Sequence, residues 1–146
     1  MSNLKTELIA MLNTALRMEH AARIQYLAHA EQVAGINAEA IIARLKELAA
    51  DEADHENKFR TLIASYLGGI PTMELAATHP AKDISAILTI NLQDEKTAID
   101  FYKQIYRKVV EHREELTYEY ETIEHELRHI IIDEQEHVTE LRTLIG

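Results

Sequence analysis

Two copies of the motif Glu-x-x-His carry the clearest chemical signal in this sequence. Glu134 and His137 are three residues apart, and so are Glu52 and His55. On an α-helix, residues at this spacing are neighbours on one face, so each motif aims a carboxylate and an imidazole in the same direction. The apolar residues around both motifs fall on that face, which predicts that the polar side chains are buried. Because a buried carboxylate without a partner is costly, we expect a metal ion to compensate it.

Two further glutamates complete the candidate site. Glu19 and Glu95 lie on apolar stripes of other helical segments, and each is followed seven residues later by a tyrosine, Tyr26 or Tyr102. Seven residues are about two helical turns, so each tyrosine shares the face of its glutamate. We expect both hydroxyls to lie beside the ligand carboxylates. The predicted metal ligands are Glu19, Glu52, His55, Glu95, Glu134 and His137.

Four carboxylates and two imidazoles form an oxygen-rich donor set with two nitrogens. Such a set suits iron or manganese, and zinc is a further candidate. Two divalent ions would balance four negative charges, which explains how the site can be buried. We expect Glu52 and Glu134 to bridge two ions about 3.5–4 Å apart. The other two glutamates would be terminal ligands, and each ion would have one histidine.

Four helical segments position these residues. Apolar residues recur at helical spacing through most of the chain, which predicts amphipathic helices. Ser2, Asn37 and Asp83 are the expected N-caps, and Gly35 is the expected end of the first helix. The predicted helices cover about 3–34, 38–67, 83–112 and 115–145.

The segment 68–82 contains both prolines and has no helical periodicity. It is long for a helix–helix loop, which usually has only a few residues. Such a segment can extend to roughly 50 Å, whereas a 30-residue helix is about 45 Å long. It can therefore run the length of a bundle and leave the second and third helices parallel. We predict one all-α domain over 1–146, a four-helix bundle with a long crossover, in which the four glutamates meet in one layer.

The composition excludes several functional classes. The net charge of −10 at pH 7 disfavours nucleic acid, whose phosphates would be repelled. The absence of cysteine excludes disulfides, thiolate zinc sites and iron–sulfur clusters. We find no apolar run long enough to cross a membrane and no signal-peptide pattern. We therefore expect a cytoplasmic protein without a membrane partner.

Five further histidines are interpreted as surface residues. A third Glu-x-x-His, Glu126 to His129, continues through Asp133 and Glu136 as a polar stripe, which indicates a solvent-exposed helix face. The other histidines expected at the surface are His20, His29, His79 and His112.

These motifs resemble those of the ferritin-like superfamily and, within it, the bacterioferritins and rubrerythrins. Glu19, followed by Gln25-Tyr26 and His29, is similar to the first-helix motif of bacterioferritins. The matches to the other three helices are Asp51-Glu52-Ala53-Asp54-His55, Glu95 and Asp133-Glu134-Gln135-Glu136-His137. The resemblance covers nearly the whole chain.

The resemblance implies a di-iron oxidoreductase with ferroxidase-type activity, in which two iron ions per subunit are oxidised by dioxygen or hydrogen peroxide. It also implies a homodimer or a higher homo-oligomer. No haem is expected, because Ala53 stands where bacterioferritins have their haem-ligating methionine. The sequence ends at Gly146, without the short fifth helix of cage-forming members, and lacks the cysteines of the rubrerythrin rubredoxin site. Two alternatives stay open: a rubrerythrin-like peroxide reductase and a non-catalytic metal-binding helical bundle.

Overall fold

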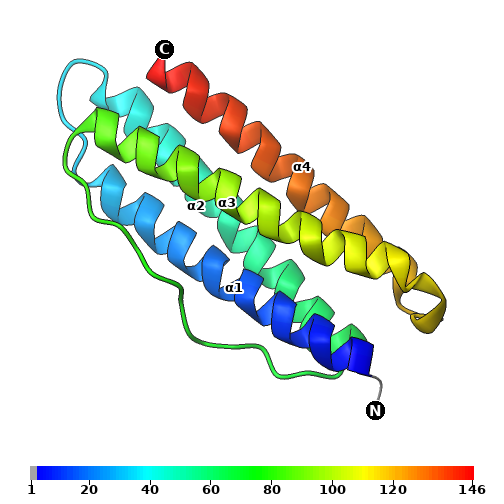
Figure 1. Ribbon diagram of the computed structural model, residues 1–146. Coiled ribbons are helices and arrows are strands. Elements are labelled where there is room, and N and C mark those ends of the chain that lie inside the picture. Colours follow the sequence, from blue (N-terminus) through cyan, green and yellow to red (C-terminus); the bar gives the residue numbers. More distant parts are fainter. Residues whose placement is uncertain (1–2) are drawn as a thin grey trace.

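The computed structural model describes residues 3–146 as two antiparallel helix pairs packed into a bundle (Figure 1). α1 (Asn3–Ala30) pairs with α2 (Ala38–Thr61), and α3 (Ile84–Glu111) pairs with α4 (Tyr120–Ile145). The part of the chain that is described contains no strand. This confirms the predicted all-α four-helix bundle. No helix in this part is long and apolar enough to cross a membrane.

The crossover between the two pairs lies against α1. The stretch from Leu67 to Asp83 contains no helix or strand, and in Figure 1 it returns along α1 from the end of α2 to the start of α3. The amide of Thr72 donates a 2.8 Å hydrogen bond to Oδ1 of Asn13. The amide of Ala76 donates to the carbonyl of Arg17 at 3.0 Å. The crossover therefore spans the bundle, and α2 and α3 run parallel, as predicted.

The start of the crossover is fitted closely to α1. After Thr61 the helix continues as a π-helical turn over Leu62–Tyr66, so the last turn of the predicted second helix is not α-helical. Gly68 then adopts a φ of +74°, which glycine tolerates best. A Cβ atom at Gly69 would lie 2.7 Å from Cγ2 of Ile9, so only glycine fits here without a shift of that side chain.

The first helix is shorter than predicted. α1 ends at Ala30 instead of residue 34. The amide of Gln32 donates to the carbonyl of His29 at 2.9 Å, a bond that spans three residues instead of four and tightens the turn. The chain reverses at Gly35, whose φ is +115°. The glycine thus marks the turn, whereas the helix ends about one helical turn before it.

The predicted N-caps have different outcomes. Asp83 caps α3, because its Oδ1 accepts a 2.8 Å hydrogen bond from the amide of Ala86. Asn37 precedes α2 but makes no side-chain cap, and its φ of −100° and ψ of 16° are not the extended conformation that capping uses. Ser2 lies outside the described residues.

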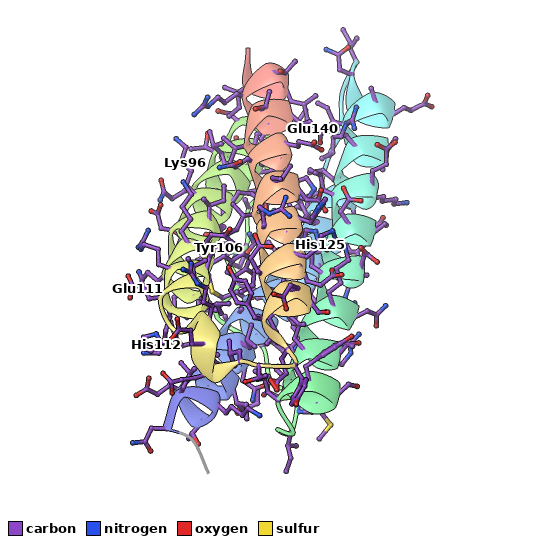
Figure 2. All side chains as sticks on the ribbon, turned by 90° about the vertical axis from the view of Figure 1, so that its right-hand side faces the viewer. Lys96, Tyr106, Glu111, His112, His125 and Glu140 are labelled. Atoms are coloured by element: carbon purple, nitrogen blue, oxygen red, sulfur yellow. The ribbon has the colours of Figure 1, made fainter. Side chains whose placement is uncertain are left out.

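The fourth helix begins at Tyr120 instead of residue 115. A 3₁₀ helix (Arg113–Glu115) follows α3, and the side chain of Leu116 after it is fully buried in the apolar core. Burying a leucine side chain stabilises a fold by about 1.5–3 kcal/mol. The burial of Leu116 accounts for the irregular connection that continues to Glu119. Figure 2 shows His112 at this end of the bundle, where α3 stops.

Two apolar clusters fill the interior, one toward each end of the bundle. The first includes Leu8, Leu12, Phe59, Ile105 and Ile123. The second includes Leu45, Leu48, Ile87, Leu88 and Leu141. Along each helix, the glutamate of the candidate site lies between the residues of the two clusters. The fold thus places a polar layer between two apolar cores.

Candidate metal centre

The structure brings all six predicted ligand side chains together in the polar layer. Each of them is at most 2% exposed to solvent. α1 contributes Glu19, α2 contributes Glu52 and His55, α3 contributes Glu95, and α4 contributes Glu134 and His137. Residues far apart in the sequence therefore converge because the four helices cross this layer at matching heights.

The side chains form two overlapping groups, in each of which the candidate ligand atoms lie within 4.8 Å of one another. The members of one group are Glu19, Glu52, His55 and Glu134, and those of the other are Glu52, Glu95, Glu134 and His137. Glu52 and Glu134 belong to both groups. These two carboxylates therefore lie within reach of the candidate ligand atoms of both groups.

Nδ1 of His55 is the centre of the first group. It lies 3.1 Å from Oε1 of Glu134, 3.3 Å from Oε1 of Glu52 and 3.6 Å from Oε1 of Glu19. This nitrogen nevertheless has no hydrogen-bond partner, and neither do the carboxylate oxygens of Glu52 and Glu134. Buried polar atoms are almost always hydrogen-bonded. A metal ion among these atoms would satisfy all of them at once, so the donor set fits a metal site.

Nδ1 of His137 is the centre of the second group. It lies 2.7 Å from Oε2 of Glu95, with which it is hydrogen-bonded. The same nitrogen is 3.3 Å from Oε1 of Glu134 and 3.5 Å from Oε1 of Glu52. Each shared carboxylate thus approaches both imidazoles, and one imidazole is available for each of two ions.

The outer nitrogens of the two imidazoles are held by carboxylates from the opposite helix. Nε2 of His55 lies 3.0 Å from Oδ2 of Asp133, and Nε2 of His137 lies 2.9 Å from Oδ2 of Asp51. In the neutral form of the ring, which is the form that binds a metal, an Nε2–H that donates to a carboxylate leaves the lone pair on Nδ1, the nitrogen that faces the centre. Neither aspartate was predicted to act at the centre, and Asp133 was expected on a solvent-exposed stripe. Their repeated position directly before Glu52 and Glu134 is the signal that identifies them.

The two predicted tyrosines are both buried beside the centre, but they differ in hydrogen bonding. Tyr102 donates a 2.7 Å hydrogen bond to Oε1 of Glu19. The hydroxyl of Tyr26 has no partner among the described residues. Burial, together with the nearby carboxylates, raises the pKa of both phenols well above the ordinary value.

Charge within the layer is unevenly distributed. Burial and the charge of Glu134 raise the pKa values of Glu19, Glu52 and Glu95. Burial acts in the same direction on Glu134, but the adjacent imidazoles of His137 and His55, whose Nδ1 atoms lie 3.3 and 3.1 Å from its Oε1, outweigh it and lower the pKa of this carboxyl. Glu134 is therefore the carboxylate most strongly favoured as an anion, and the cations that stabilise it are the two imidazoliums.

His29 is buried, contrary to the prediction that it lies at the surface. Its Nε2 donates to the carbonyl of His79 in the crossover at 2.7 Å, and its Nδ1 accepts from Nδ2 of Asn91 at 2.9 Å. Gln25 also binds the crossover through the amide of His79 and reaches Oδ2 of Asp94 at 2.8 Å. The crossover covers this polar network, and the helical periodicity of α1 could not reveal that cover.

A cavity of about 210 Å³ lies beside the centre, between α1, α3 and the crossover. Tyr26, Glu52, Glu95 and Glu134 form its polar inner wall. The rest of its wall combines small or apolar side chains with polar ones. The former are Met18, Ala21, Ala22, Ala76, Ala77 and Ala98, and the latter are Gln25, His79, Asn91, Asp94, Thr97 and Tyr102. The cavity therefore provides space for a small molecule in contact with the candidate ligands.

Comparison with known proteins gives one family and several related structures. The family described as a ferritin-like domain matches residues 9–146. No curated protein sequence matches the chain.

Three solved structures illustrate the likeness. A ferritin-like, diiron-carboxylate protein from Bacillus anthracis str. Ames is 27% identical, with a TM-score of 0.90 and full coverage of both chains. The bacterioferritin-related dodecameric thioferritin from Bacteroides fragilis is 25% identical, with a TM-score of 0.82, over 95% of this chain and 84% of that one. The bacterioferritin of Desulfovibrio desulfuricans is 24% identical, with a TM-score of 0.85, over 98% of this chain and 80% of that one.

Proposed function

Because the chain belongs to the ferritin-like domain family, we propose that its buried cluster binds two iron ions and acts as a ferroxidase-type centre. The observation that carries this proposal is the pair of overlapping ligand groups that share Glu52 and Glu134. Two ions held by shared carboxylates supply two electrons to one oxidant at a single site. The Bacillus anthracis relative, described as a diiron-carboxylate protein, supports the assignment.

The proposed roles follow from the contacts of each group. Glu52 and Glu134, which belong to both groups, would be shared by the two ions, Glu19 and Glu95 would each be a ligand of one ion, and Nδ1 of one imidazole would serve each ion. The four carboxylates offset the four positive charges of two Fe(II) ions, so the loaded layer is close to neutral. Manganese and zinc fit the same donors, with oxygen-rich sets favouring the harder metals.

The proposed reaction balances with either oxidant. Two Fe(II) ions lose one electron each and become Fe(III). Dioxygen takes up these two electrons and two protons to give hydrogen peroxide, whereas hydrogen peroxide takes them up to give two waters. The neighbouring cavity of about 210 Å³ exceeds the roughly 150 Å³ that accommodates benzene in an engineered protein cavity. Either oxidant therefore has room to approach the carboxylates.

An anaerobic Fe(II) titration followed by rapid mixing with dioxygen, or separately with peroxide, tests the proposal. We expect saturation at two Fe(II) per chain and rapid oxidation. Glu52→Ala and Glu134→Ala should abolish the rapid phase because each removes a carboxylate shared by both groups. Glu136→Ala is the matched control, since Glu136 lies exposed on α4.

The possible results separate the candidate functions. Oxidation at equal rates in the wild type and the Glu52→Ala variant would contradict the proposal. A strong preference for peroxide over dioxygen would indicate a rubrerythrin-like peroxide reductase. Thermal stabilisation by Zn(II) without any oxidation of Fe(II) would indicate a metal that serves folding alone.

We also propose that the chain assembles as a homodimer or a higher homo-oligomer. The dodecameric relative from Bacteroides fragilis supports this expectation. Ile24 and Leu27 lie close together on α1 and are 40% and 41% exposed, which leaves apolar surface for such a contact. Sedimentation equilibrium of the purified protein gives the molecular mass of the assembly. A mass of one chain at all concentrations would contradict this part of the proposal.

A further inference from the structure

Two exposed histidines lie one turn apart on the outer surface of α4. The ring centres of His125 and His129 are 4.2 Å apart, and the ring planes are tilted by 36°. Both residues are exposed, and neither belongs to the buried layer. Figure 2 shows His125 on the side of α4 that lies toward α2. The pair is therefore accessible to a ligand without any opening of the bundle.

The spacing of the two histidines suits chelation of one ion. Residues four apart on a helix lie on the same face, and two histidines at this spacing are a recurrent metal-binding unit. Metal–nitrogen bonds of about 2.0–2.1 Å place the two bound nitrogens roughly 3 Å apart. Rings with centres 4.2 Å apart need only small rotations to reach that separation. The side chain of His125 is 55% exposed, which leaves it free to make them.

A carboxylate lies next to the pair. Oε1 of Glu126 is 3.7 Å from Nδ1 of His125. The other oxygen of Glu126 is 3.8 Å from Nζ of Lys58 on α2, so this side chain is oriented along the gap between the two helices. The ligand atoms of His125, Glu126 and His129 do not all lie within 4.8 Å of one another. A rotation of the Glu126 side chain would bring an oxygen donor to an ion bound by the imidazoles, and water could complete its coordination.

The chemistry of this pair differs from that of the buried layer. Two neutral imidazoles and one carboxylate suit borderline ions such as Zn(II), Ni(II) or Cu(II), whereas the layer has four carboxylates for two histidines. The net charge of −10 favours the approach of any cation. We propose that His125 and His129, with Glu126 beside them, form a surface site that binds one divalent transition-metal ion.

The site has a predictable effect on local stability. α4 begins at Tyr120, so the two histidines lie within its first three turns. An ion that bridges them joins successive turns and binds only when the helix is formed, so it stabilises this end of α4. Hydrogen exchange of the amides in residues 121–130 should slow when the ion is bound.

The test uses the full chain with the buried layer disabled by Glu52→Gln and Glu134→Gln, so that it does not depend on the proposed iron chemistry. Zn(II) binding is measured by calorimetry, and Cu(II) is used as a spectroscopic probe of nitrogen ligands. His125→Gln and His129→Gln are compared with His112→Gln, a control that removes a histidine at the end of α3 (Figure 2). The same variants in the wild-type background show whether disabling the layer has altered the surface.

We expect one Zn(II) to bind in the disabled background, and its affinity to fall about tenfold or more in either His125→Gln or His129→Gln. Tenfold corresponds to about 1.4 kcal/mol. The control should keep its affinity, and the Cu(II) spectrum should show two nitrogen ligands that each variant reduces to one. The proposal is overturned if either variant binds as well as the control, or if Zn(II) leaves hydrogen exchange at the start of α4 unchanged.

Discussion

Tyr102 on α3 donates a 2.7 Å hydrogen bond to Glu19 on α1 and so joins the two halves of the chain across the polar layer. Tyr26 occupies the repeated position in the first half, but its hydroxyl has no partner. Glu95, which corresponds to Glu19, is hydrogen-bonded to Nδ1 of His137 instead. The two halves therefore repeat in sequence but not in hydrogen bonding, and the two phenols should contribute unequally to stability.

Replacing each tyrosine by phenylalanine measures this inequality. Tyr102→Phe leaves the buried Oε1 of Glu19 without its donor and should lower the free energy of unfolding by about 1–3 kcal/mol. Tyr26→Phe removes a hydroxyl that has no partner and should change it by about 0.5 kcal/mol or less. Urea unfolding of the metal-free protein gives both values. Equal losses in the two variants would show that the difference in hydrogen bonding has no energetic effect.

Asp133 should control the metal affinity of the centre through His55. Removing a carboxylate that orients a ligand imidazole typically weakens metal binding by about 10- to 100-fold. We therefore expect Asp133→Ala to weaken binding of the first or second Co(II) ion by about that factor. Asp54→Ala is the matched control, because Asp54 is 62% exposed and pairs with Lys58. Competitive titration with a chelator measures the affinities, and identical values for the two variants would contradict the assigned role.

The buried carboxyl of Glu52 should destabilise the metal-free protein. Both of its carboxylate oxygens are buried without hydrogen-bond partners. Burial and the charges of the other glutamates raise its pKa well above the ordinary value. Glu52→Gln replaces this carboxyl with a neutral group of the same shape. We expect the free energy of unfolding of the metal-free variant to lie within about 1 kcal/mol of the wild-type value or to exceed it.

Added metal should stabilise the wild type more than it stabilises the Glu52→Gln variant. The wild type should gain thermal stability when Co(II) or Zn(II) is added, whereas Glu52→Gln should gain much less, because it lacks a ligand shared by both groups. Differential scanning calorimetry with and without metal gives this comparison. A variant that is strongly destabilised without metal, yet stabilised normally by metal, would contradict both expectations.

The stability of the metal-free protein should fall between pH 6.5 and 10. Burial lowers the pKa of His137, but the adjacent carboxylate of Glu134 outweighs it and raises the pKa to about 10. A base with a raised pKa in the folded state stabilises the protein fully below its ordinary pKa, and this contribution is lost as the pH rises through the folded value. The raised pKa values of Glu52 and Glu95 act in the same direction. The lowered pKa of Glu134 acts in the opposite direction, but only below the ordinary glutamate range.

The pH dependence can be checked by thermal unfolding of the metal-free protein across this range. Metal binding must also release the proton from Nδ1 of His137, so the apparent affinity should rise with pH and calorimetry in two buffers should detect proton release at pH 7 to 8. The control variant His112→Gln should leave the pH dependence of both thermal unfolding and metal affinity unchanged. Metal binding without proton release would show that the imidazole is already neutral in the metal-free protein.

Helical periodicity was sufficient to predict the fold and to bring the candidate ligands into one layer. Glu19 and Glu52 lie at nearly equal distances from the first turn, and antiparallel helices place such residues at one height. Their function as metal ligands stays a prediction. Periodicity could not predict that Asp133 reaches His55, because that contact depends on how α4 is rotated against α2.

The irregular segments explain the other differences between sequence and structure. His29 looked like a surface residue because the crossover that covers it has no periodic pattern. The start of α4 was placed too early because no glycine or proline marks the turn, while the burial of Leu116 decides it. Both errors arise where tertiary contacts, and not local propensity, determine the conformation.

The crossover is fastened to α1 at several heights, by Asn13 to Thr72, by Arg17 to Ala76 and by Gln25 to His79. A helical turn inserted into α1 between these anchors would move them apart by about 5.4 Å, and the irregular crossover segment would have to span the added length. The number of residues in α1 is therefore matched to the number in the crossover. Changes of length in this protein must occur in both segments together, or be confined to the short turns at the ends of the bundle.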